Sequence, residues 1–287
     1  MKNPHKNPEA PWIGILCLVV YLGIGAIESQ AKGIFYPCYR ASVPPVIDGV
    51  VNDGEWPSAE QLDFADLVTA EHPALASSAR MMWDDDCLYL AFSFADTNIW
   101  GRQTKRDIPL DPDFKGYTEN FAKVYIDPDG DGRNYTEMHF TPSGAFNDKW
   151  QSAPWKSEAR TACGLPANEP AQSHWEWNCE GMRSAVAVQG TLNKTNDIDQ
   201  AWTLEVSIPF AALKQFAGKS ACPPVADDTW RVHLGRRYQI EGGNPTNTAY
   251  WTWPVLGVAD CHNPDRWGYV VFVNDRHPKV PASFADL

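Results

Sequence analysis

The sequence lacks the short motifs that mark most enzymes and nucleotide-binding proteins. It contains no Cys-x-x-Cys pair, no phosphate-binding loop, no Ser-His-Asp signature and no zinc-ligand spacing. Basic residues are also scarce: Lys and Arg total 24 against 36 Asp and Glu, a formal net charge of −12. Nucleic acids and anionic membranes favour clustered positive charge, so this balance disfavours both as partners. No carboxylate pair stands out by its spacing as a glycosidase pair, and we expect no enzyme activity.

Long apolar runs are absent except near the N-terminus, where one extends from Trp12 to Ile27. Lys2 and Lys6 precede this run and a small-x-small signal ends at Ala31, which is the layout of a secretory signal peptide. We therefore expect residues 1–31 to be removed on export; a retained N-terminal anchor is the alternative. Residues 32–287 should then form a single domain, monomeric and free of the membrane. The protein would be secreted, periplasmic or attached to the cell surface.

Export would change the meaning of the cysteines, because an oxidising compartment favours disulfides. Six cysteines follow the expected cleavage point, and they allow 15 connectivities. Cys163 with Cys179 is the first pair that we expect, because both lie in one long, loop-rich insertion. Cys222 with Cys261 is the second.

Helical patterns are scarce, and short strands separated by turn residues dominate the chain. Residues 79–83 and 87–94 flank Asp84-Asp-Asp86, and residues 122–126 and 134–140 flank a second acidic turn; both pairs predict β-hairpins. Further strands are predicted over 182–189, 202–208, 230–238 and 267–273. Only residues 209–216 have a helical pattern, with proline at the first position. The chain is therefore predicted to be all-β, an antiparallel, jelly-roll-like β-sandwich with one short helix.

The second acidic turn, residues 127–132, is the best candidate for a metal site. Asp127, Asp129 and Asp131 alternate and glycine occupies the sixth position, as in the first half of an EF-hand loop. However, position twelve is Met138 rather than glutamate, and the flanking segments are predicted strands. A structural calcium ion and a plain polar turn are therefore both compatible with these residues. The same two readings apply to the turn at residues 84–86.

Six sequence blocks occur in a recognisable order between about residues 41 and 273. Together they resemble the family 9 carbohydrate-binding modules. The blocks are Pro45–Trp56, Trp83–Phe92, Val124–Asp131, Gln189–Asn193, Trp202–Phe210 and Trp251–Gly257 leading into His262–Tyr269.

The resemblance implies a non-catalytic β-sandwich that binds a glycan or oligosaccharide, usually at its reducing end. The sugar would be held between aromatic side chains, and calcium would have a structural role. Such modules usually accompany glycoside hydrolases, so the protein would support polysaccharide breakdown. Aromatic rings would cover the faces of a pyranose, and polar side chains would satisfy its hydroxyls.

Trp251 and Trp253 are the first candidates for an aromatic wall of this site, within a sequence that has 13 Trp in all. They stand two apart in a predicted strand and therefore share one face of it. Asn247 and Tyr250 lie just upstream and complete an aromatic-plus-amide cluster. The alternative is that both tryptophans belong to the core.

The opposite wall is expected from the loop before the strand at 122–126. The family often has an aromatic residue there, and Tyr117 and Trp100 are the two candidates; loop packing is the alternative. The family commonly has glutamate in that strand, where this chain has Lys123. The family also often has a Glu-x-x-x-Asn stretch, whereas the stretch here begins with Glu137 and ends with Thr141. A lysine can donate to a hydroxyl where a glutamate would accept.

Two other functions remain open at this stage. Similar sandwiches also serve as haem-b electron-transfer domains, in which methionine, histidine or lysine provides the axial ligands. The residues that could act in this way are Met81, Met82, Met138, His139 and His233. A purely structural surface protein is the third reading, with the tryptophans used for packing alone.

Overall fold

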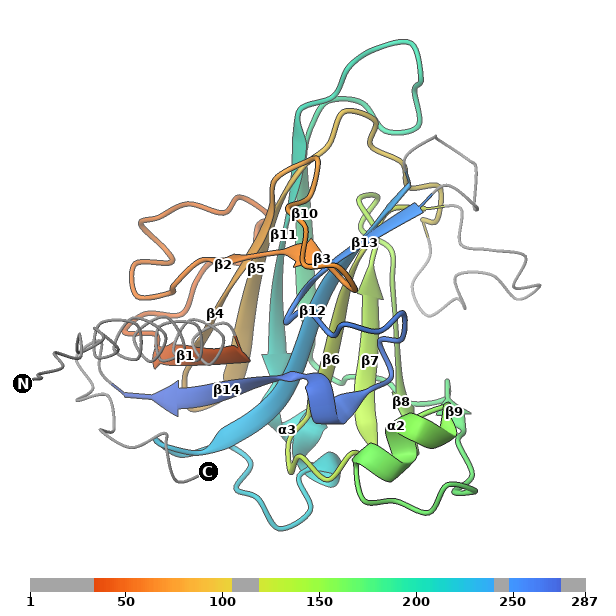
Figure 1. Cartoon of the computed structure of the whole chain (residues 1–287). Coiled ribbons are helices and arrows are strands. Elements are labelled where there is room, and N and C mark those ends of the chain that lie inside the picture. The colour runs from red at the N-terminus through yellow and green to blue at the C-terminus, as the bar shows by residue number, and fades with distance from the viewer. Residues whose placement is uncertain (1–33, 105–118, 240–247, 275–287) are drawn as a thin grey trace, which may run out of the picture.

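The computed structural model describes residues 34–104, 119–239 and 248–274 (Figure 1). The expected signal peptide, Tyr117 and Asn247 lie outside these ranges. Strands dominate the described chain: β1 (Phe35–Arg40), β2 (Leu62–Asp63), β3 (Ala65–Asp66), β4 (Ser77–Trp83), β5 (Cys87–Ala95), β6 (Phe121–Asp127), β7 (Tyr135–Phe140), β8 (Phe146–Gln151), β9 (Ser173–His174), β10 (Arg183–Gln189), β11 (Ala201–Pro209), β12 (Thr229–Gln239), β13 (Thr248–Trp253) and β14 (Gly268–Val273). The helices are α2 (Ser157–Ala162) and α3 (Phe210–Leu213), with 3-10 turns η1 (Lys214–Phe216) and η2 (Pro264–Arg266).

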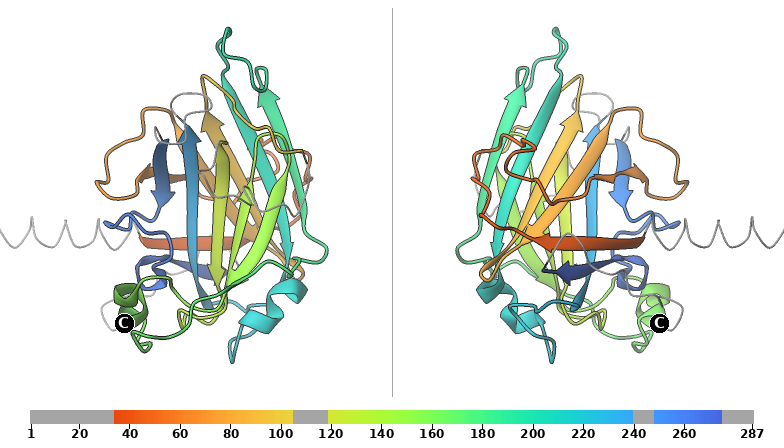
Figure 2. Two further views of the ribbon diagram at one scale, coloured as in Figure 1. Left: turned by 90° about the vertical axis from the view of Figure 1, so that its right-hand side faces the viewer. Right: turned by 90° about the vertical axis from the view of Figure 1, so that its left-hand side faces the viewer.

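The strands form one sheet in the order β10-β11-β5-β4-β1-β14-β12-β6-β7-β8-β9, with β13 beside β12. The sheet curls, so that the half containing β5 and β11 faces the half containing β6, β7 and β12 (Figure 2). All pairs are antiparallel except those of β1, which runs parallel to both β14 and β4. The predicted β-sandwich is therefore confirmed, with β1 as a parallel connection between the two halves.

The two predicted hairpins are present. Strands β4 and β5 pair around the turn at 84–86, and β6 and β7 pair around the turn at 127–132. Oδ1 of Asp84 accepts hydrogen bonds from the backbone N–H groups of Asp86 and Cys87, both at 2.8 Å. Asp85 forms an ion pair with Arg40. These contacts give Asp84 and Asp85 structural roles and favour the interpretation of residues 84–86 as a plain polar turn.

The predicted helix at 209–216 is also present, as α3 followed by η1, with Pro209 immediately before the first helical residue. The short helix α2 was not predicted; it lies in the insertion after β8. No helix within the described ranges is both long and apolar enough to span a bilayer.

The core lies between the two halves of the sheet. Strand alternation builds it, because every second residue points inward. On one side Val124, Met138 and Leu234 are fully buried, and Leu90 and Val206 oppose them from the other half. The residues between these inward positions on β6, β7 and β12 point to the other face of the same strands.

The described ranges contain no disulfide, so neither predicted pair is seen and both stay predictions. The six cysteines in the described ranges are all free, and the members of each expected pair have different surroundings. Cys163 lies against Gly132, whereas the backbone N–H of Cys179 donates to Asp148. The thiol of Cys222 donates to the carbonyl of Phe210, whereas that of Cys261 lies 3.8 Å from a lysine ammonium.

Candidate functional site

The face of β6, β7, β8, β12 and β13 that points away from the core carries polar and aromatic side chains, which we call the polar layer. The register brings them together: Glu137 pairs with both Tyr125 and Lys149, and Lys123 pairs with both His139 and Gly235. Except for half-buried Tyr250, the members are buried. The polar layer consists of Lys123, Tyr125, Glu137, His139, Lys149, Gln151, His233, Arg237 and Tyr250.

Glu137 is the centre of this layer, and its side chain is only 2% exposed. One carboxylate oxygen accepts from Gln151 Nε2 at 2.6 Å and lies 3.1 Å from Lys149 Nζ. The other accepts from Tyr125 Oη at 3.2 Å and lies 3.1 Å from His139 Nε2. Both oxygens are therefore used within the protein, so Glu137 positions its neighbours, Lys149 above all.

The electrostatics of the layer follow from burial. Burial works against the charged form of Glu137, but Lys149, His262 and His139 together hold the pKa of this carboxyl well below its usual value. Burial lowers the pKa of His139 to about 4, with Glu137 partly offsetting the effect, and lowers the pKa of His233 to about 3. At neutral pH the layer therefore contains a charged carboxylate beside neutral imidazoles.

Lys123 differs from Lys149 because it has no carboxylate partner in the described part of the chain. Its ammonium nitrogen lies 3.8 Å from Cys261 Sγ. It also lies 4.9 Å from the ring centroid of Tyr250 and 5.6 Å from that of Phe121. The side chain is nevertheless buried. Lys123 is therefore a buried cation whose partners among the described residues are two aromatic rings and a thiol.

Two tryptophans from the insertion after β8 form an aromatic rim at the lower end of the polar layer. Trp175, which directly follows β9, is 41% exposed, and its ring centroid lies 4.0 Å from Lys149 Nζ. Trp155, which precedes α2, is 46% exposed and meets the His262 ring edge-on at 6.4 Å. His262 Nε2 in turn lies 3.9 Å from Glu137. Both exposed rings therefore adjoin the Glu137 network.

The sequence analysis did not select these two residues. Their only signal was the concentration of tryptophans in one long insertion, which could not indicate the face on which each ring would lie. Trp175 reaches the polar layer because β9 pairs with β8 and continues the alternation of that pair.

Trp251 and Trp253 do share one face, as predicted, but it is the core face of β13. They pair with Arg236 and Leu234 of β12, and each is 5% exposed. Trp251 stacks on Tyr238 with ring centroids 5.3 Å apart. The ring of Trp253 lies so close to Gly268 that an added Cβ there would come within 2.3 Å of it. These contacts correspond to the core alternative, and a sugar-stacking role for either ring stays a prediction.

Trp100 is likewise buried, with the guanidinium of Arg102 4.5 Å from its ring centroid. Its carbonyl accepts from the backbone N–H of Asn120, one residue before β6. The other predicted members of the walls, Tyr117 and Asn247, lie outside the described residues. Of the predicted site, the structure thus places Lys123 in the polar layer beside Tyr250, and places Trp100, Trp251 and Trp253 in buried packing.

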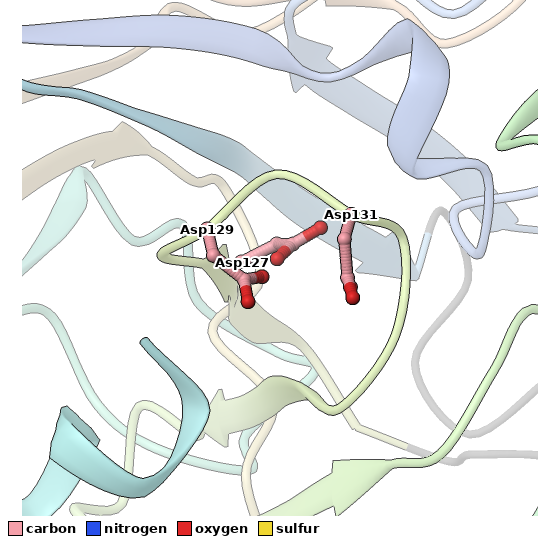
Figure 3. Close-up of side chains that lie close together, drawn as sticks. All are labelled: Asp127, Asp129 and Asp131. Carbon is pink, nitrogen blue, oxygen red and sulfur yellow. The ribbon is translucent and has the colours of Figure 1, made fainter. Parts of the chain in front are cut away.

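The acidic turn after β6 brings the predicted metal ligands together (Figure 3). One carboxylate oxygen from each of Asp127, Asp129 and Asp131 lies within 4.8 Å of the others. Asp127 is buried and accepts from the backbone N–H groups of Gly130 and Gly132. Burial, followed by the charges of its two neighbours, raises the pKa of Asp127 well above its usual value. Oδ1 of Asp129 is buried without a hydrogen-bond partner. This donor set fits a hard cation.

The methionine–histidine pairs that haem binding would need are separated by the sheet. Met138 points into the core, whereas the adjacent His139 points into the polar layer. Met81 also lies in the main core, and Met82 packs in a separate cluster with Trp56. Within the described residues, none of these three methionines therefore lies on the face that carries His139 and His233.

Comparison with known proteins identifies the family. The family described as carbohydrate family 9 binding domain-like matches residues 47–275. The chain therefore belongs to this family, which confirms the resemblance that the sequence blocks indicated. The family is one of non-catalytic binding modules, in agreement with the expectation that the protein is not an enzyme. No curated protein matches the chain significantly.

Solved structures share the fold. A family 9 carbohydrate-binding module from Caldicellulosiruptor kristjanssonii in complex with cellotriose has a TM-score of 0.53 and 13% identity, over 84% of this chain and 94% of that one. A second structure from this organism, in complex with glucose, has a TM-score of 0.50 and 12% identity, over 85% and 100%. A Bacteroides uniformis protein has a TM-score of 0.53 and 13% identity, over 83% and 97%. At these identities the likeness concerns the fold alone.

Proposed function

We propose that this protein is a non-catalytic glycan-binding module whose ligand lies on the polar layer and the adjoining aromatic rim. The observation that carries the proposal is the position of two exposed tryptophans, Trp155 and Trp175, beside buried polar groups that belong to a carbohydrate-binding family fold. Aromatic faces suit the C–H faces of a pyranose, and Lys149 and Tyr250 can donate to hydroxyls at its rim.

Titration of the two rim variants tests this function. After a glycan array has identified a ligand, Trp155→Ala and Trp175→Ala should each lower its affinity about thirtyfold by calorimetry, because truncation of an aromatic anchor costs about 2 kcal/mol. Both rings are exposed, so the melting temperature should change little. Ile198→Ala is the matched control, since this exposed residue lies in the loop between β10 and β11, at the other end of the sheet from β9 (Figure 1). Affinities equal to wild type in both rim variants would contradict the proposed site.

Recognition of the reducing end and a role in polysaccharide breakdown by an exported protein are part of the proposal, and both rest on the family resemblance. Reduction of the terminal sugar to its alditol opens the ring that would stack on an aromatic face. We therefore expect the alditol of the bound oligosaccharide to lose most of its affinity. Equal binding of the two forms would instead indicate recognition along the glycan chain.

A structural calcium ion at Asp127, Asp129 and Asp131 is proposed as well. The converging carboxylates and the unpartnered oxygen of Asp129 support it. Calcium would offset the mutual repulsion of the carboxylates and stabilise the folded state by mass action. Millimolar calcium should raise the melting temperature of chelator-treated wild type but not of Asp129→Asn. Unchanged melting of the wild type would refute the metal site.

A further inference from the structure

We infer that the preferred ligand of the polar layer is an acidic glycan, in which the carboxylate of a hexuronic acid pairs with Lys123. This inference rests on the proposed function, and it assigns the chemical class of the sugar that the site takes. It follows from the charges at the upper end of the polar layer, near Tyr250.

The first observation is the unbalanced charge of Lys123. The chain as a whole carries a net charge of −12, yet this buried ammonium has no carboxylate partner in the described part of the protein. The carboxylate of the layer, Glu137, is occupied by Lys149, Gln151 and Tyr125. A buried cation without an anion is costly, and an acidic ligand would remove that cost.

The neighbours of Lys123 do not provide a negative charge. Burial raises the pKa of the Cys261 thiol, so the sulfur 3.8 Å away is neutral at physiological pH. Tyr250 and Phe121 provide only the negative faces of their rings. The backbone partner of Lys123 on β12 is Gly235, which has no side chain to place above the ammonium.

The charge of Lys123 also acts on the two buried histidines of the layer. Burial is the main cause of the lowered pKa values of His139 and His233, and the charge of Lys123 lowers both further. Arg237, on the adjacent strand β12, adds a guanidinium whose Nη1 donates to a neutral carbonyl, that of Glu119. The two cationic side chains at this end of the layer are therefore Lys123 and Arg237, which suits a ligand with a negative charge.

Calorimetry with matched neutral and acidic sugars tests the inference. The probes are cellotriose with cellotriuronate, and galactotriose with trigalacturonate; within each pair the acidic member has carboxylates in place of the C6 hydroxymethyl groups. We expect wild type to bind at least one acidic trisaccharide about tenfold or more tightly than its neutral partner. Lys123→Met keeps the apolar stem and removes the charge, and it should bring that ratio close to one. Lys123→Glu should invert it.

Lys219→Met is the control, because it makes the same charge change at an exposed lysine after η1 and should leave the wild-type ratio intact. Equal or tighter binding of the neutral sugars by wild type would overturn the inference while leaving the proposed function in place. An acid preference that persists in both Lys123 variants would overturn the assignment to Lys123. Failure of all four trisaccharides to bind at millimolar concentration would also overturn it, and the glycan array would then decide the proposed function separately.

Discussion

The two faces of strands β6, β7 and β12 share one backbone but have opposite chemistry. The inner face carries Val124, Met138 and Leu234, which are fully buried among apolar side chains. The outer face carries Lys123, Glu137 and His233, which are almost equally buried but polar. Apolar burial stabilises a fold, whereas buried ions and buried imidazoles contribute little to stability or reduce it. The comparison therefore separates the face that holds the protein together from the face on which we propose that the ligand binds.

Removing the central carboxylate should have the largest effect. Glu137→Leu leaves Lys149 as a buried charge without a partner, which costs about 3–5 kcal/mol of folding free energy. In the double variant Glu137→Leu/Lys149→Leu the part of the loss that comes from the unpaired charge should be recovered, whereas Gln151 and Tyr125 still lack their acceptor. Denaturant unfolding of the two variants checks this. Equal stability of single and double variant would show that the ion pair is not the source of the loss.

A cavity on the inner face should cost slightly less. Leu234→Ala removes a fully buried side chain from the core, at about 2–5 kcal/mol. Glycan affinity at a temperature where the variant is folded should equal that of wild type, because the polar layer is unchanged. A large loss of affinity together with an unchanged melting temperature would reverse the roles that we assign to the two faces.

The histidines of the outer face should make stability depend on pH. His139 and His233 have pKa values of about 4 and 3 when folded, below their unfolded value of about 6.5. Between pH 6.5 and 4 the unfolded chain therefore binds more protons, so the free energy of unfolding falls as the pH falls. Each such proton contributes about 1.4 kcal/mol per pH unit.

His233→Phe keeps an aromatic ring beside Trp267, where His233 now stacks, and removes one of these protons. Its free energy of unfolding should therefore fall less steeply than that of wild type between pH 6.5 and 4.5, measured by denaturant unfolding. His72→Phe, which changes an exposed histidine outside the layer, serves as the control. A slope identical to wild type in His233→Phe would mean that this imidazole is not held neutral in the folded state.

Most of the fold could be predicted from the sequence because strand alternation and turn residues are local signals. The hairpins around residues 84–86 and 127–132 and the helix that begins after Pro209 all follow from such patterns. The parallel position of β1 and the short helix α2 could not be predicted, because each depends on distant contacts.

The surroundings of the candidate site residues could be predicted only in part, for a related reason. Spacing correctly placed Trp251 and Trp253 on one face of a strand, but it could not tell the core face from the outer face when both carry aromatic residues. Trp175 lies beside Lys149 only because β9 returns along β8, a pairing within a long insertion that has no local signature. The departure at Lys123 was visible in the sequence, whereas its lack of a carboxylate partner required the structure.

The most direct test of the account is calorimetric titration of Glu137→Leu/Lys149→Leu with the highest-affinity glycan found for wild type. If the polar layer serves the ligand, this variant, titrated at a temperature where it is folded, binds at least tenfold more weakly than wild type. Wild-type affinity in a variant whose polar centre has become apolar would contradict the assignment of the site to this face.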